Sequence, residues 1–468
     1  MNTSNRKNVL ILSFALVVVT LGFGMVIPLF PFYIEKLGAG GSDLGLLIAT
    51  SALFEFLCAP IWGSISDRAG RKPVLMIGMV GYGLSSLLFG LSTQVWMLYG
   101  SRALSGLLSS ATAASAMAYI GDSTSEEDRG SGIGMLGAAM GLGLIVGPGL
   151  GGWLGAGSLA TPFFIAAGLA LLALLLILLF LPESLPAGAR QGGSVQTVQF
   201  GELGRALVSP IGILLGLLFL VSFGLTNFEA VFGLYAAEKL GYGPDRVGMI
   251  LVVVGITSTL GKATLIGPLT RRWGEPVIIK GSMLASSVGF LVLLLANSYV
   301  TILVATGLFI LSKTLLRTAL LSLASRRSEI PRQARDDVPR QARDDVPRQA
   351  RDDMLGEARE IPRQAQDDVP RQAWDDVVGQ ARDGSVRQVV RRAHHAARDG
   401  SVGQGVVMGL GNSFINLGRI VGPIWAGVIF DVNWSYPYLS GAAIMFVGFL
   451  IGLRWVSRGR TATSCGFP

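Results

Sequence analysis

The chain has 468 residues, of which 51% are hydrophobic and only 15% are charged, and its formal net charge is +8 at pH 7. Soluble domains carry about 25% charged residues, so this composition excludes an ordinary soluble protein and places most of the chain in lipid. The basic excess fits loops that face anionic lipid, and no nucleic-acid partner is expected.

Apolar stretches of the roughly 20 residues needed to cross about 30 Å of hydrocarbon recur along the whole chain. They lie near residues 8–33, 44–64, 73–93, 95–120, 131–155, 160–181, 209–236, 246–269, 277–297, 299–324, 404–430 and 437–456. These stretches predict an all-α membrane protein with twelve transmembrane helices, six in each half of the chain.

Lys and Arg are distributed unevenly over the segments that connect these stretches. One side of the membrane would carry Arg6, Lys7, Arg68, Arg71, Lys72, Arg129, Arg190, Arg205, Arg271, Arg272, Arg454 and Arg458, and the other only Lys36, Lys239 and Arg246. Because basic loops remain in the cytoplasm, we expect a multi-pass protein of the cell membrane with both termini cytoplasmic.

Two short motifs occur once in each half of the chain. The sequence GSISDRAGRK at 63–72 returns in eroded form as GPLTRRWGEP at 267–276, and EKLG at 35–38 returns at 238–241. Duplicated halves are common in secondary transporters, which place the substrate site at mid-membrane between the halves. The sequence therefore predicts a transporter of small molecules.

The predicted organisation follows from these halves and from one stretch of different composition. It comprises an N-terminal six-helix half at 1–181, a central cytoplasmic loop at 182–208, helices 7–10 at 209–325, an insertion at 326–402, helices 11–12 at 403–457 and a tail at 458–468. The insertion repeats the octad IPRQARDD with proline in each copy and few apolar residues, so we expect it to be disordered. Uniform octads of this kind favour a translated DNA repeat array over a regulatory segment that binds a partner.

Span 5 is rich in small residues, which let helix backbones approach closely. The positions singled out there are Gly137, Gly141, Gly147, Pro148, Gly151 and Gly152. Span 11 repeats the pattern as Gly418, Arg419, Gly422 and Pro423. We expect both spans to make close and deformable contacts with partner helices, although ordinary packing within the membrane gives the same pattern.

Ionisable residues inside spans are costly and are expected to face the interior of the bundle. They are Glu55, Arg102, Glu229, Lys262, Lys313, Arg317 and Arg419. Because burial disfavours a charged carboxylate, Glu55 and Glu229 are candidates for a proton carrier, with Glu55 ranked first for its central depth. Each is equally well explained as the structural partner of a buried cation. The cations Lys262, Lys313, Arg317 and Arg419 are candidates for lining a substrate cavity.

Four motifs together resemble the major facilitator superfamily, and within it the twelve-helix drug:proton antiporters of the multidrug and tetracycline type. They are the 63–72 loop, a span 1 pattern with Gly22, Pro28 and Pro31, the pair Arg102 and Gly106 in span 4, and the glycine-proline run of span 5. The resemblance implies two pseudo-symmetric six-helix halves and export by alternating access. It also implies that Arg102 assists proton transfer, and that the proton gradient supplies the energy without a cofactor.

The same resemblance implies a gating latch in the 63–72 loop. Its residues are Gly63, Asp67, Arg68, Gly70, Arg71 and Lys72, with Asp67 reaching the start of span 11. A carboxylate there can accept hydrogen bonds from a helix N-terminus or from arginines, so physical chemistry permits such a latch. A simple tight turn that carries topogenic charge explains the same residues.

No nucleotide-binding loop, Ser-His-Asp set or HExxH helix occurs, so neither an enzyme nor a metal site is expected. The main hypothesis is a monomeric, proton-coupled exporter of small molecules, of the multidrug type. Two alternatives remain open. One is a proton-coupled transporter of an organic anion or metabolite, which the interior cations favour, and the other is a carrier disabled by the insertion.

Overall fold

The computed structural model describes residues 3–123, 126–185, 203–204, 207, 212–344 and 404–458, and every regular element in these ranges is helical. The elements of the first half are α1 Thr3–Val26, η1 Ile27–Leu29, α2 Phe30–Lys36, α3 Gly41–Ala69, α4 Arg71–Gly90, α5 Val95–Leu104, η2 Ser105–Ser109, α6 Ser110–Ser123, α7 Glu126–Gly157 and α8 Thr161–Phe180. Those of the second half are α10 Gly212–Leu240, α11 Pro244–Leu260, η4 Gly261–Leu265, α12 Ile266–Trp273, α13 Glu275–Leu295, α14 Tyr299–Asp344, α18 Gln404–Val432 and α19 Tyr436–Arg458.

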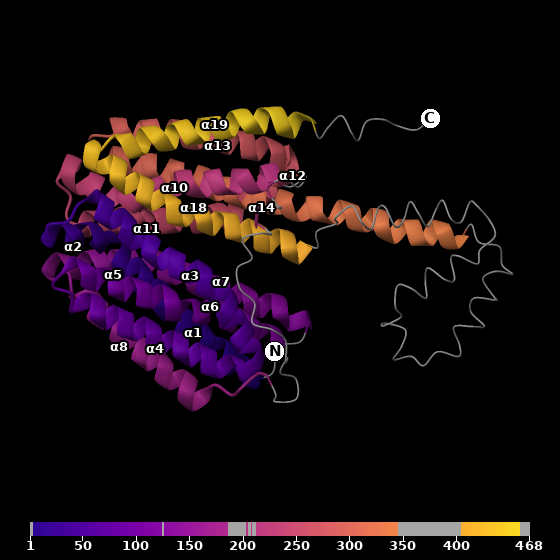
Figure 1. Cartoon of the computed structure of the whole chain (residues 1–468), viewed down its shortest axis with the longest axis horizontal. Coiled ribbons are helices and arrows are strands. Elements are labelled where there is room, and N and C mark those ends of the chain that lie inside the picture. The colour runs from indigo at the N-terminus through magenta and orange to yellow at the C-terminus, as the bar shows by residue number, and fades with distance from the viewer. Residues whose placement is uncertain are drawn as a thin grey trace. The chain divides into compact units, whose positions relative to one another are not determined.

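Within the described residues, 12 helical segments are long and apolar enough to cross a membrane, from Asn8–Lys36 to Tyr436–Leu453. The predicted all-α fold with twelve spans is confirmed. The chain forms two compact units, one of residues 1–320 with 410–468 and one of residues 321–409. Within the first unit, Figure 1 shows α1 to α8 grouped together and the helices of the second half, magenta to yellow, in a second group.

The helix that contains span 10 is longer than the sequence predicted. The apolar part ends at Leu323, near the expected position, but α14 continues to Asp344 and so includes the first octads of the predicted insertion. Proline disfavours a helix interior, but Ala, Arg and Gln, which fill much of each octad, are strong helix formers. The rest of the predicted insertion, from residue 345 to 402, lies outside the described residues, as does the histidine pair at 394–395.

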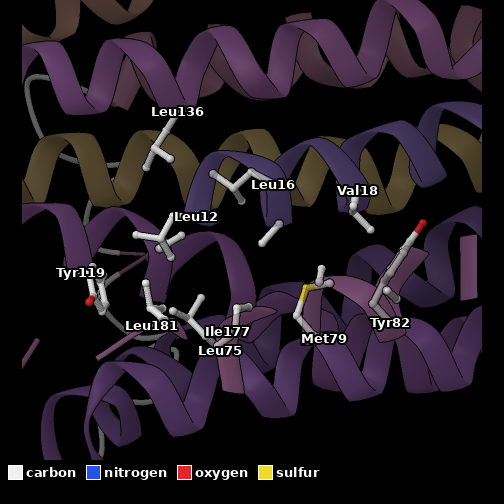
Figure 2. Packing of buried hydrophobic residues seen from close by; sticks show 14 of the residues in the cluster. Leu12, Leu16, Val18, Leu75, Met79, Tyr82, Tyr119, Leu136, Ile177 and Leu181 are labelled. Atoms are coloured by element: carbon white, nitrogen blue, oxygen red, sulfur yellow. The ribbon is translucent and has the colours of Figure 1, made fainter. Parts of the chain in front are cut away.

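The core of the first half shows why helical spacing of apolar residues produces this bundle. Leu12 and Leu16, four residues apart on α1, are fully buried against a cluster that includes Leu75 and Met79 of α4 and Ile177 of α8 (Figure 2). A second cluster stacks aromatic rings at the far end of these helices, where the Phe89 and Phe163 centroids lie 4.3 Å apart. These contacts fix α1, α4 and α8 to one another.

Glycines of α7 allow two helices to approach it on different faces. A methyl group on Gly147 would lie 2.5 Å from the carbonyl oxygen of Leu21, and one on Gly151 would lie 2.1 Å from that of Met25, both on α1. On another face, a methyl group on Gly152 would lie 2.4 Å from the Pro244 carbonyl oxygen of α11. Helix α7 therefore joins its own half and also the second half.

The second half repeats this arrangement with α18 in place of α7. A methyl group on Gly422 would lie 2.0 Å from Thr226 Oγ1 of α10, within the same half. A methyl group on Gly45 of α3 would lie 2.2 Å from the Pro423 carbonyl oxygen, across the halves. The glycine-proline segments of α7 and α18 are therefore equivalent contacts in the two repeats.

Substitution of Gly151 by alanine tests whether the close approach of α7 to α1 needs glycine. The added methyl meets backbone atoms of Met25, so one helix must shift, at a cost of about 1–3 kcal/mol. We expect Gly151→Ala to lower the thermal unfolding midpoint of the purified protein in detergent. The matched control is Gly137→Ala on the same helix, where no atom of the described part of the chain lies within 4 Å of the added methyl. Equal midpoints for the two variants would contradict this packing account.

Candidate functional site

The 63–72 segment, which the sequence placed in a loop, is helical in the structure except for Gly70, because α3 extends to Ala69 and α4 begins at Arg71. It forms a polar hub at the junction of these two helices. Asp67 pairs with Arg71 at 2.6 Å, and Arg71 also donates from Nε to Asp122 of α6 at 2.8 Å. The Arg71 side chain is largely buried, which favours ordered geometry for these charged contacts. The hub therefore connects three helices of the first half.

The side chain of Glu183, a residue that follows α8, caps the N-terminus of α4. Its carboxylate accepts hydrogen bonds from the backbone N–H groups of Arg71 at 2.8 Å and Lys72 at 3.2 Å. Gly70 has a φ of +108°, and a side chain there would meet Glu183 at 2.4 Å. A carboxylate at a helix N-terminus is favourable, and only glycine leaves room for it here.

The predicted latch from Asp67 to the start of span 11 stays a prediction. The described partner of Asp67 is Arg71, and the side chains at 404–408 lie outside the described residues. A methyl group on Gly63 would meet no atom of the described residues within 4 Å.

The span 1 motif breaks the helix and shapes its surroundings. Pro28 lies in the 3-10 turn η1 between α1 and α2, where proline's fixed φ suits a helix start. Pro31 packs against α10 of the second half, since a methyl on Gly233 would lie 2.4 Å from its Cγ. Gly22 lies against Tyr82, whose hydroxyl would be only 1.6 Å from a methyl group at that position.

Arg102 is buried within the first half. Its Nη2 donates to Ser51 Oγ of α3 at 2.5 Å, and its guanidinium lies 4.8 Å from the ring centroid of Phe30 on α2. The charge of Arg102 also interacts with that of Glu55. The π-helical segment η2 begins three residues after Arg102, and such segments often occur at functional sites.

The two predicted carboxylates each face a cation on another helix. Lys313 of α14 donates a hydrogen bond to Glu229 of α10, within the second half. Glu55 of α3 lies 3.8 Å from Arg419 of α18, so this pair joins the two halves. The Glu229 and Glu55 side chains remain 53% and 45% exposed, which keeps both carboxylates accessible.

Further cations lie near these pairs. The charges of Arg317 and Arg419 interact with that of Glu229, and Lys262 of η4 interacts with Lys313 and Arg317. We call this set the central charge cluster; its members are Glu55, Glu229, Lys262, Lys313, Arg317 and Arg419. The structure thus brings the predicted ionisable residues together, with more cations than carboxylates among them.

A clasp between the halves was not predicted from the sequence. Asp431 at the end of α18 accepts hydrogen bonds from the backbone N–H groups of Gly41 at 2.6 Å and Ser42 at 2.9 Å, at the start of α3. Its carboxylate therefore caps a helix of the opposite half, where the helix dipole favours negative charge. The sequence around a single Asp near the end of a span does not indicate which distant residue the Asp contacts.

Other residues missed by sequence reasoning are Ser51, Tyr82, Asp122 and Glu183. Among the predicted glycines, Gly137 has no close neighbour and Gly141 only Thr259 at 3.9 Å, so neither takes part in the tight contacts. Helical spacing of small residues on α11, such as Gly248 and Gly255, was the available signal for the partner of α7.

Comparison with known proteins agrees with this architecture. The family model described as Major Facilitator Superfamily matches residues 12–335. Among curated proteins, Multidrug resistance protein 2 of Bacillus subtilis is 26% identical over 447 residues, covering 95% of this chain and 94% of the relative. Multidrug resistance protein 1 of the same organism is 27% identical, covering 96% and 97%.

A third relative, the Quinolone resistance protein NorA of Staphylococcus aureus, is 23% identical and covers 96% of each chain. Among solved structures, the nucleoside transporter NupG superposes with a TM-score of 0.70 at 12% identity, covering 95% of this chain and 99% of that one. The human organic anion transporter MFSD10 gives a TM-score of 0.58 at 19% identity, covering 96% and 99%. With its twelve spans, its duplicated halves and the family match over most of its length, the chain belongs to the Major Facilitator Superfamily.

Proposed function

We propose that this protein is a proton-coupled exporter of small organic molecules, of the multidrug type, that works by alternating access. The names of the curated relatives support the multidrug assignment. The proposal includes a monomer in the plasma membrane with both termini cytoplasmic, in accord with the positions of the basic residues.

One observation carries the proton-coupling part of the proposal: the Glu55–Arg419 pair joins the two halves. Protonation of Glu55 removes its charge and therefore its attraction to Arg419. Proton binding then weakens the Glu55–Arg419 contact, which must change when the two halves move relative to one another. Protonation of Glu229 would similarly release Lys313, but within one half.

Energetics permit a single carboxylate to serve as the proton carrier. One proton that enters down a potential of 100 mV releases about 2.3 kcal/mol. This is sufficient for a substrate gradient of about fifty-fold, since each 1.4 kcal/mol corresponds to a factor of about ten. Arg102, whose charge interacts with that of Glu55, is proposed to stabilise the ionised carboxylate after proton release.

Gating is proposed to use a different contact at each end of the bundle. The clasp of Asp431 on the start of α3 holds the halves together at one end. By the proposed orientation this end is extracellular, so the clasp closes the outer side. At the opposite end, the hub of Asp67, Arg71 and Asp122 and the cap by Glu183 position the 63–72 segment, and the predicted latch to span 11 would close the inner side.

The proton carriers can be tested by efflux of fluorescent lipophilic dyes from energised cells that express this chain. We expect Glu55→Gln to abolish uncoupler-sensitive efflux, because the neutral amide cannot cycle a proton. Glu229→Gln should reduce efflux as well, by releasing Lys313. The matched control is Glu238→Gln, an exposed carboxylate on the same helix as Glu229, which should leave efflux unchanged. Full uncoupler-sensitive efflux by Glu55→Gln would rule out this carrier.

The outer clasp can be tested with Asp431→Asn. The amide keeps one acceptor oxygen but loses the charge, so the closed contact should weaken by about 1–2 kcal/mol. That corresponds to a shift of about 5- to 30-fold in the open-to-closed equilibrium. With spin labels at the exposed positions Thr93 and Asn297, one in each half, the distances between the two labels should include a larger population of long values than in the parent chain.

The control for the clasp experiment is Asp245→Asn, which removes a carboxylate from the first turn of α11. Its carboxylate lies by Gly243 of the same half, so it should leave the distance distribution unchanged. A distribution for Asp431→Asn that matches the parent chain would show that the clasp does not hold the outer side closed.

A second candidate function is transport of an organic anion. It is favoured by the excess of cations in the central charge cluster, which suits an anionic or zwitterionic substrate. In the same cells, an anionic dye would then be transported where cationic dyes are not, and Arg317→Gln would abolish that transport.

A third reading, a carrier disabled by the octad repeats, is tested by deleting residues 328–400. Transport by the full chain excludes this reading. Recovery of transport only after the deletion would support it.

A further inference from the structure

A small cavity lies within the first half, beside Arg102. It has a volume of about 40 Å³ and lies between helices α1, α4, α5 and α8. Gly22, Tyr82 and Arg102 line it together with Ser85, Ser86 and Ser105, and the rings of Phe89 and Phe163 form part of its wall.

Two buried polar groups that line this cavity make no hydrogen bond with any of the described residues. They are the hydroxyl of Tyr82 and Nε of Arg102. The residues are 7% and 9% exposed, so bulk solvent does not satisfy them. Figure 2 shows the Tyr82 oxygen directed away from Met79 and the packed aliphatic cluster. Buried polar groups are nearly always paired, either with protein or with ordered water.

We propose that this cavity holds a bound water molecule that bridges the Tyr82 hydroxyl and Arg102 Nε. A site for one water needs roughly 10–15 Å³ and two to four polar partners. The cavity exceeds that volume and supplies the partners. The Nε–H and phenol O–H groups donate to the water. Ser85 and Ser86 donate their own protons to the Tyr82 carbonyl at 3.0 and 2.8 Å, so their lone pairs are available to accept from it.

Hydrogen bonding rather than charge favours water over a small anion, since the charge of Arg102 interacts both with the negative charge of Glu55 and with the positive charge of Arg419. A neutral ligand that both donates and accepts matches the mixture of hydroxyl and N–H groups. An empty cavity is expected only where the lining is apolar throughout.

The bridge makes Tyr82 a positioning residue for Arg102. Two other contacts hold the guanidinium of Arg102: its Nη2 donates to Ser51 Oγ at 2.5 Å, and it lies 4.8 Å from the ring centroid of Phe30. The water would hold Nε from the side of α4. Gly22 is required for this arrangement, because any side chain there would collide with the Tyr82 hydroxyl. The turn at Pro28 does not explain why the span 1 motif contains Gly22, whereas the space that the Tyr82 hydroxyl needs does explain it.

The water itself is tested by X-ray hydroxyl-radical footprinting of the full chain in nanodiscs, read by mass spectrometry. Buried residues beside a bound water are oxidised quickly, whereas dry buried residues are not. We expect Tyr82 to be oxidised several-fold faster than Tyr235, which is fully buried and donates its hydroxyl to Leu293 at 2.8 Å. Equal slow rates for the two tyrosines would mean a dry cavity and would overturn the proposal.

The same experiment distinguishes water from a bound anion. Footprinting is repeated with gluconate in place of chloride, and the Tyr82 rate should not change. A rate that rises several-fold when chloride is removed would identify a bound anion and would also overturn the proposal. This readout needs no transport activity, so it remains valid if the proposed function fails.

The positioning role rests on the proposed function and has its own test. Tyr82→Phe removes the hydroxyl and should shift the pH profile of dye efflux, because Arg102, whose charge interacts with that of Glu55, would lose its bridge to α4. Tyr33→Phe is the matched control, since that buried hydroxyl donates to the Gly90 carbonyl at 3.2 Å and Tyr33 does not line the cavity. Identical pH profiles for Tyr82→Phe and the parent chain would overturn the positioning role.

Discussion

The close approach of helix backbones at glycines of α7 and α18 is the constraint on which the rest of the structure depends. Apolar side chains gain little by leaving lipid for one another, so helices in a membrane associate through tight packing and polar contacts. At Gly151 and Gly422 a single added methyl would overlap the neighbouring helix. Because α7 and α18 each contact both halves, this packing determines which charged residues come within reach of one another.

The contacts between the halves are of two kinds. The glycine-proline segments bring backbones together without directional bonds, so they tolerate small rotations of one half against the other. The clasp of Asp431 on α3 and the Glu55–Arg419 pair are polar and specific to one geometry. A carrier that alternates between two states benefits from both kinds, because the first permits movement and the second selects the end points.

Polar groups within the first half follow a different rule. Arg102, Tyr82 and Arg71 are buried, and each must find hydrogen-bond partners locally. Arg71 does so with Asp67 and Asp122, both on helices that meet at the 63–72 segment. Arg102 has Ser51 and an aromatic ring but no carboxylate in direct contact among the described contacts, which leaves its Nε for the proposed water.

The sequence by itself determined the fold class, the twelve spans and the duplication, because apolar length and repeated motifs are local properties of the chain. It also identified the ionisable residues of the central charge cluster, since charge within a span stands out against lipid-compatible neighbours. It did not find Asp431 or Tyr82, nor the continuation of α14 to Asp344. Pairings such as Gly41 with Asp431 join residues almost 400 positions apart, and only the tertiary structure decides them, because they depend on how the two halves pack against one another.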